Sequence, residues 1–237
     1  MKKVLNKASD RGGANHGWLI AKHSFSFASY QNFENMNFGA LRVLNDDIVA
    51  PGMGFGTHPH SNMEIITIPL RGSLEHKDSM GNTSVIQEGE IQVMSAGSGI
   101  THSEFNASKT DPINLFQLWI FPNQQNVVPR YDQFVMDVVK MKNNFLQLVS
   151  PDQNGEGTWV YQNAWIHIAE FEDGFDTEYT VKDVNNGVYV MNIHGEIKVE
   201  GDSLFDRDAA GFWETDKIHF QSIGKSKVLL IEIPMVF

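Results

Sequence analysis

Two histidines alternate around a proline in residues 56–65, GTHPHSNMEI. In an extended segment successive side chains point to opposite faces, so His58 and His60 project the same way, about 6–7 Å apart along the backbone. That geometry suits two ligands of one metal ion. Pro59 donates no backbone hydrogen bond, which predicts that the segment lies at the edge or the start of a strand. Two exposed loop histidines are the simpler interpretation, so the rest of the chain must decide.

A second pair of candidate ligands follows in SAGSGITHSEFN, where His102 and Glu104 again occupy positions i and i+2. Two neighbouring strands that each present such a pair to one interior bring three imidazoles and one carboxylate together. This sulfur-free donor set suits Fe(II), Mn(II), Co(II), Ni(II), Cu(II) or Zn(II), and it leaves one or two positions open on an octahedral ion. Open positions favour catalysis. By strand parity Glu64 lies on the face of His58 and His60, so it competes with Glu104 as the carboxylate ligand.

Length and composition predict a soluble globular protein. The chain has 237 residues, 41% of them hydrophobic, which is enough for one large or two small cores. No stretch approaches the roughly 18 consecutive apolar residues of a membrane span, and the first residues lack the apolar core of a signal peptide. The absence of cysteine excludes disulfides, thiolate ligands and a cysteine nucleophile. We therefore expect a cytoplasmic protein that does not bind membranes.

The charge of the chain excludes further classes of function. Eighteen basic and 29 acidic residues give a net charge of −11, spread along the whole sequence. This charge disfavours direct binding of nucleic acid. The sequence has neither a P-loop nor a G-x-S-x-G motif, so nucleotide chemistry and serine hydrolysis are not indicated.

Short β-favouring runs between turn signals predict an all-β protein of the sandwich or barrel type. Only residues 131–140, YDQFVMDVVK, have a helix-like apolar period. The two halves also resemble each other, because LRGSLEH around Gly72 matches IHGEIKV around Gly195, and LWIFP ending at Pro122 matches LIEIP ending at Pro234. This duplication predicts two similar β-domains, residues 1–130 and residues 131–237.

The spacing of the candidate ligands resembles the two motifs of the cupin superfamily, small double-sheet jelly-roll barrels that hold a metal ion in the barrel mouth. Five residues separate Gly52 from His58, and the turn SAGSG precedes His102. Over residues 11–122, and more weakly to the C-terminus, the chain is similar to the pirin family of bicupins. Three segments carry this resemblance: HGWLIAKHSFSFASYQN, FGALRVLNDDIVAPGMGFGTHPHSNMEIITIPLRGSLEHKDSMGN and IQVMSAGSGITHSEFN.

The resemblance implies a bicupin fold, with two tandem double-sheet jelly-roll barrels packed on each other. It implies that His58, His60, His102 and Glu104 bind one divalent transition metal ion per chain, with Fe(II) as first choice. Glu64 then lies outside the ligand set and orients a ligand imidazole.

The second half is expected to lack a metal site. Aligning Gly195 with Gly72 places Val181 and Asp183 where the first half has its H-x-H pair, so the barrel of residues 131–237 is interpreted as structural. Two other histidines have two interpretations each. For His23 a structural role in an arm over the first barrel is preferred to contact with substrate, and for His76 the ordering of a hairpin is preferred to contact with the metal.

The resemblance also implies a function, a metal-dependent dioxygenase that cleaves flavonols such as quercetin, with Glu104 as general base. Its partners are then a flavonol-like substrate and dioxygen, and the protein is expected to be a monomer. Two alternatives remain at this point. One is a regulatory protein, acting on transcription or on an enzyme, whose metal site shapes a surface for a protein partner. The other is a cupin enzyme for a different diol.

Overall fold

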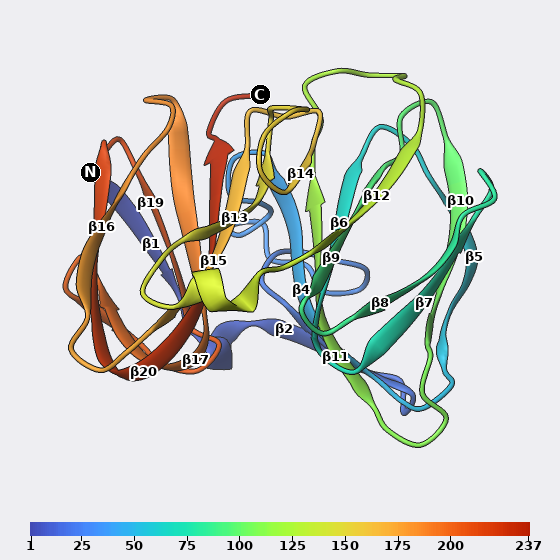
Figure 1. The fold of residues 1–237 in the computed structure, drawn as a ribbon, viewed down its shortest axis with the longest axis horizontal. Helices are drawn as coiled ribbons and strands as arrows, with labels where there is room; N and C mark the ends of the chain where they lie inside the picture. The colour runs from blue at the N-terminus through green and yellow to red at the C-terminus, as the bar shows by residue number, and fades with distance from the viewer.

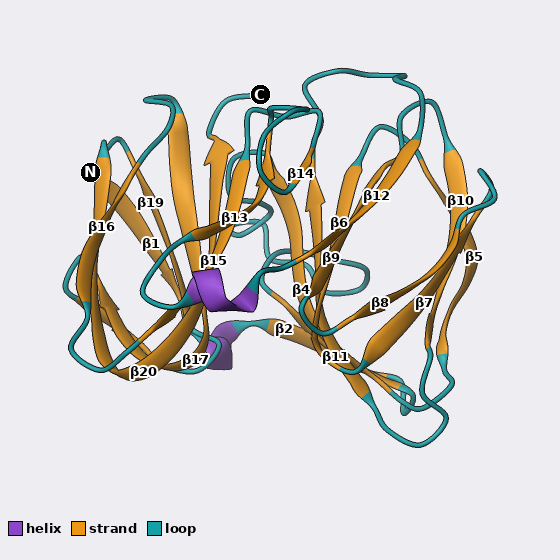
Figure 2. Cartoon of the chain, in the orientation of Figure 1, coloured by secondary structure: helices purple, strands orange, loops and turns teal.

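The computed structural model describes all residues 1–237, which form two β-barrels that lie side by side (Figure 1). The first half of the chain builds mainly the barrel on the right of the figure, and the orange and red second half builds the barrel on the left. The only helices are two short 3-10 turns, η1 (Ala8–Asp10) and η2 (Val138–Met141), purple in Figure 2. Neither is long and apolar enough to cross a membrane. The expected all-β bicupin fold is confirmed.

Two antiparallel sheets form the N-terminal barrel. The smaller sheet has the strand order β5 (Gly54–His60), β10 (Ile100–Asn106), β7 (Ser73–Asp78) and β8 (Thr83–Gln87). The larger sheet has the order β12 (Arg130–Val135), β9 (Glu90–Ser95), β6 (Glu64–Arg71), β11 (Ile113–Ile120), β4 (Leu41–Val49), β3 (Leu19–His23) and β2 (Gly12–Asn15). Strand β5 has a neighbour on one side only, so the predicted edge position of Pro59 is confirmed.

One nine-stranded sheet curls into the C-terminal barrel. Its main path is β1 (Lys2–Asn6), β19 (Ala209–Trp213), β17 (Asn186–Val199), β20 (Lys217–Pro234), β15 (Trp165–Phe171), β13 (Leu146–Ser150) and β14 (Thr158–Trp159). Two strands join it off this path, β16 (Asp176–Thr180) beside β20 and β18 (Asp202–Leu204) beside β17.

The two halves share one pairing pattern, as their matching sequences suggest. Strand β17 pairs with β20 along nearly its whole length, whereas in the first half β6 pairs with β11 and β7 pairs with β10. Gly72 joins β6 to β7, and Gly195 lies at the corresponding irregularity of β17. Both have a left-handed backbone, with φ of 84° and 86°, which glycine adopts without strain.

Two segments depart from expectations based on the order of the sequence. Strand β1, at the N-terminus, pairs with β19 and so lies in the C-terminal barrel, where Figure 1 shows it in blue. Residues 131–140 are not a helix: most of β12 lies there and pairs in register with β9, and η2 follows. Backbone pairing with β9 outweighs the weak helical period of this segment. The domain boundary at residue 130 stays a prediction.

The barrels share one hydrophobic core between their large sheets. A cluster of 28 buried residues draws side chains from both halves of the chain. Phe116 and Leu118 of β11 belong to this cluster, whereas Leu115 of the same strand packs inside the N-terminal barrel. Strand β11 is therefore buried on both faces: one face packs against the second barrel, and the other lines the interior of the N-terminal barrel.

The two barrel interiors differ in chemistry. A cluster of 14 apolar residues fills the C-terminal barrel. The N-terminal barrel has smaller apolar clusters of seven and four residues, and polar side chains lie on its inner walls. Only the N-terminal interior therefore presents many polar groups to a ligand.

The shared core gives a first prediction. Leu118→Ala is expected to lower the free energy of unfolding by about 2–5 kcal/mol, because it leaves a cavity between the sheets. The two barrels should still unfold in one transition. Denaturant unfolding followed by circular dichroism measures both quantities, and Val128→Ala is the control because Val128 is 80% exposed. Two separate transitions in the wild-type protein would contradict the shared core.

Candidate metal centre

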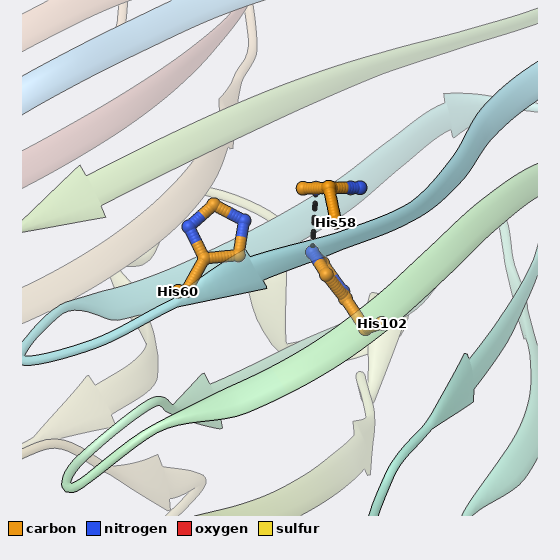
Figure 3. A group of neighbouring side chains, drawn as sticks. All are labelled: His58, His60 and His102. Atoms are coloured by element: carbon orange, nitrogen blue, oxygen red, sulfur yellow. Dashed lines mark hydrogen bonds between the residues drawn. The ribbon is translucent and has the colours of Figure 1, made fainter.

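Three histidine rings meet on the inner side of the small sheet of the N-terminal barrel. His58 and His60 come from edge strand β5, and His102 lies directly opposite His58 on β10. Figure 3 shows the three rings turned toward one another. Their centroids are 4.4–4.9 Å apart, and their ligand atoms lie within 4.8 Å of one another. The predicted convergence of the H-x-H pair and His102 is therefore present.

Two of the ring nitrogens are spaced as adjacent ligands of one metal ion would be. His58 Nδ1 lies 2.8 Å from the carbonyl oxygen of Gly56, which directs its Nε2 inward. This Nε2 lies 3.0 Å from Nε2 of His102. Metal–nitrogen bonds of about 2.1 Å at right angles separate two nitrogens by about 3 Å, so the spacing fits adjacent positions on one ion.

Burial keeps two of the rings neutral. Desolvation, with the neighbouring imidazoles, lowers the pKa of His60 to about 4 and that of His102 to about 3. Neutral imidazoles have a free lone pair at physiological pH, and metal binding needs that form. His60 and His102 can therefore bind a metal ion without losing protons.

Glu104 lies next to the histidines and is fixed by two side chains of the large sheet. Gln117 Nε2 donates to both carboxylate oxygens, at 3.1 and 2.9 Å, and Thr67 Oγ1 donates to Oε1 at 3.3 Å. The carboxylate belongs to a second close group with His76 and His102. Glu104 is thus adjacent to the three-histidine group through the shared His102.

Glu64 does not have the role expected from strand parity. Its carboxylate accepts a hydrogen bond from Ser95 Oγ at 2.7 Å. In the sheet, Glu64 of β6 is paired with Ile120 of β11, a residue of the shared core. The expectation that it orients an imidazole is wrong, because the turn at residues 61–63 takes the chain from the small sheet to the large one. Parity does not carry across that turn, and Glu64 points toward the other barrel.

His76 was expected to order a hairpin, and it has this role only indirectly. Its buried Nε2 lies 3.2 Å from Asp78 Oδ2, and Asp78 also accepts hydrogen bonds from the backbone of Met80 and Asn82 in the turn. The ring of His76 is 5.3 Å from that of His102. Asp78 therefore orders the hairpin turn and also contacts His76, which packs against His102.

A cavity of about 200 Å³ lies in front of this group. Its lining residues come from both sheets: Leu19, Ala21, His23, Phe27, Asn45, Asp47, Phe55, His58, His60, Glu104, Gln117 and Trp119. His23 is a residue of β3 in the barrel wall, and its Nδ1 lies 2.9 Å from Asn45 Oδ1. For it a structural role in an arm over the barrel was preferred to contact with substrate; the structure makes it part of the cavity wall.

Sequence reasoning missed Asn45, Asp47 and Gln117. One signal for them exists, because each is a polar residue within a strand that also carries several large apolar residues, LRVLNDDIV or INLFQLWI. Asp47 is the most unusual of the three. Burial, with smaller contributions from Asp46 and Glu104, raises its pKa to about 8.

The fold and this pocket define a bicupin with a histidine-rich centre in its first barrel. Comparisons with known proteins agree. The Pirin family matches residues 4–120, and the quercetinase C-terminal cupin domain matches residues 147–233. The "Quercetin 2,3-dioxygenase" of Escherichia coli (strain K12) is 42% identical over 236 residues, covering 98% of this chain and 99% of the relative.

Solved structures give the same result. The crystal structure of YhhW from Escherichia coli superposes with a TM-score of 0.94 at 38% identity and covers 99% of both chains. A structure of bacterial pirin YhhW from Escherichia coli in complex with nickel(II) has a TM-score of 0.93 at 37% identity, covering 99% of this chain and 100% of that one. The chain belongs to the pirin family.

The position of Glu64 generates a prediction about pH. Burial raises its pKa from 4.5 to about 7, so the folded protein retains a proton that the unfolded chain loses. The stabilisation from this proton is complete below about pH 4.5 and is lost as the pH rises through 7. Glu64→Gln should therefore gain about 1–3 kcal/mol relative to wild type between pH 4.5 and pH 8.

Urea unfolding at both pH values measures this difference. Glu156→Gln serves as the control, since Glu156 is exposed. A difference between Glu64→Gln and wild type that is the same at both pH values would contradict the raised pKa.

Proposed function

We propose that His58, His60, His102 and Glu104 bind one divalent transition metal ion per chain, with Fe(II) as first choice. The observation that supports this most directly is the 3.0 Å separation of two imidazole nitrogens on adjacent strands. Glu104 lies two residues after His102 on β10. It is the only carboxylate in the two groups of close ligand atoms, His58–His60–His102 and His76–His102–Glu104. In the same proposal residues 1–130 form the metal-binding domain and residues 131–237 the second barrel.

We further propose that the protein is a dioxygenase that cleaves flavonols such as quercetin with dioxygen. The relatives named quercetin 2,3-dioxygenase and the histidine-rich cavity support this reaction. A bound metal ion supplies Lewis acidity and open positions at which substrate and dioxygen can meet. The overall reaction puts both atoms of dioxygen into the product, breaks two carbon–carbon bonds and releases carbon monoxide.

The protein's own residues prepare the substrate in this proposal. Glu104 accepts the proton of the flavonol hydroxyl group as general base, while Gln117 and Thr67 hold its carboxylate in place. The apolar walls exclude water, which would otherwise compete for the open positions. Trp119 packs edge-on against His60, at 5.0 Å between ring centroids, and restricts the orientation of that ring.

The cavity also limits how the substrate is placed. At about 200 Å³ it is below the roughly 300–1,000 Å³ of sites for drug-sized ligands. Part of a flavonol therefore enters between the aromatic walls, and the remainder stays at the mouth. The ring that carries the reacting oxygens has to be the part that enters, since the histidines line the cavity itself.

The proposed ligand set predicts a metal content close to one ion per chain. Glu104→Ala is expected to weaken metal binding about tenfold or more, because it removes a charged ligand, whereas Glu64→Ala should leave the affinity close to wild type. Elemental analysis of purified protein and competition with a chelator measure content and affinity. Two ions per chain, or a larger loss for Glu64→Ala, would reverse the assignment.

The proposed reaction predicts oxygen uptake together with loss of flavonol absorbance when iron-loaded protein is added to quercetin. Chelation and His60→Ala should both abolish it, because each removes the metal centre. His194→Ala is the matched control, since the His194 side chain is 75% exposed and lies in the other half of the chain. Absence of turnover above the free-iron background in fully loaded protein would reject the dioxygenase and favour a regulatory function.

A further inference from the structure

Asp47 presents a buried carboxyl group to the cavity from the wall opposite the small sheet. It lies on the inner face of β4, paired in register with Ala21 of β3 and Leu115 of β11. Neither neighbour has a polar side chain. Asp47 is 4% exposed, and its Oδ1 is buried without a hydrogen-bond partner.

The charged groups around Asp47 offset only a small part of its burial. Arg11 lies 3.6 Å from the carboxylate of Asp46, on the other face of β4, and Arg207 lies 2.9 Å from that same carboxylate. Glu104 across the cavity is hydrogen-bonded to Gln117 and Thr67. Asp47 is thus a buried polar group without a protein partner. The same cavity is lined by two of the three clustered histidines and by Glu104.

A buried polar atom that lacks a partner destabilises a protein, and in a binding cavity a ligand can supply the missing hydrogen bond. The aromatic walls of this cavity, Phe27, Phe55 and Trp119, suit a flat ring. A carboxyl group at its wall suits a hydroxyl substituent on such a ring, because it accepts a hydrogen bond from a phenol whether or not it is ionised.

We propose that Asp47 contacts the substrate and selects it, by hydrogen-bonding a phenolic hydroxyl group on an aromatic ring that is fused or attached to the reacting ring. This inference rests on the proposed function and adds the substrate feature that is recognised. The histidines and Glu104 bind the reacting end of the ring from the small sheet, and Asp47 binds a second substituent from the large sheet. Recognition at two points fixes the orientation of the ring and rejects rings without the second hydroxyl group.

The test compares flavonols that differ only in their hydroxyl groups: one substituted on both ring systems, and two analogues that each lack the hydroxyls of one ring system, the metal-binding hydroxyl being kept. Equilibrium binding to metal-loaded protein without oxygen is measured by quenching of tryptophan fluorescence, for which Trp119 is well placed. Wild type should bind the fully substituted compound about five- to tenfold more tightly than one of the two analogues.

Asp47→Leu should remove that difference while the metal content stays at the wild-type value. Asp47→Asn, which retains the hydrogen-bonding capacity, should keep most of it. Asp46→Asn is the matched control, since it changes the adjacent carboxylate on the outer face of the same strand and should keep the difference. KM should rise for Asp47→Leu more than kcat falls.

The outcomes separate the two proposals. If wild type cleaves flavonols and Asp47→Leu discriminates between the analogues as wild type does, the role of Asp47 is rejected and the dioxygenase stands. If wild type binds the hydroxylated compound selectively through Asp47 and cleaves none, the role of Asp47 stands and the dioxygenase is rejected. If wild type binds none of the three compounds, both are rejected.

Discussion

The packing of two large sheets against each other is the interaction on which the rest of the structure depends. It buries the 28-residue cluster between the barrels and makes the central strands of the N-terminal large sheet apolar on one face. These strands then hold a fixed register, because a slip by one residue would move the apolar set to the barrel interior. The opposite face of the same strands is thereby free to carry polar residues without loss of the core.

This register aligns a row of polar side chains across five neighbouring strands. His23, Asn45, Gln117, Thr67 and Gln92 are paired one with the next from β3 to β9. Gln117 and Thr67 in the middle of this row are the donors to Glu104, which belongs to the other sheet. The position of the carboxylate beside the histidines is therefore fixed by strands whose other face packs on the second barrel, and the two barrels are coupled through these strands.

Local patterns predicted the features that depend on a single strand. The pairing of His58 with His60 and the edge position of Pro59 follow from alternation within β5, and the convergence on His102 needs only a neighbouring strand. Glu64 was misplaced because Asn62, with φ of 48°, lies in a turn that ends the alternation.

The polar cavity residues Asn45, Asp47 and Gln117 were missed for a different reason. When both faces of a strand are buried, periodicity does not identify the face that lines a cavity. Asn45 and Asp47 point into the barrel, whereas Asp46 between them faces the arginines at the barrel interface. Only the tertiary arrangement distinguishes these three adjacent polar residues.

The buried carboxylates of the two barrels differ in how fully they are hydrogen-bonded. In the C-terminal barrel Glu232 accepts hydrogen bonds from Tyr179 Oη, from the backbone nitrogens of Lys182 and Asp183 and from Asn186 Nδ2. Its capacity is used to fix the loop that contains the counterpart of the H-x-H pair, and the apolar cluster fills the space beside it. In the N-terminal barrel Glu104 has only two side-chain donors, and Asp47 has none. A carboxylate saturated by its own loop stabilises the fold, whereas one left partly unsatisfied beside a cavity retains capacity for a metal ion or a ligand. The buried carboxylate of the C-terminal barrel thus fixes a loop, whereas those of the N-terminal barrel keep hydrogen-bonding capacity beside a cavity.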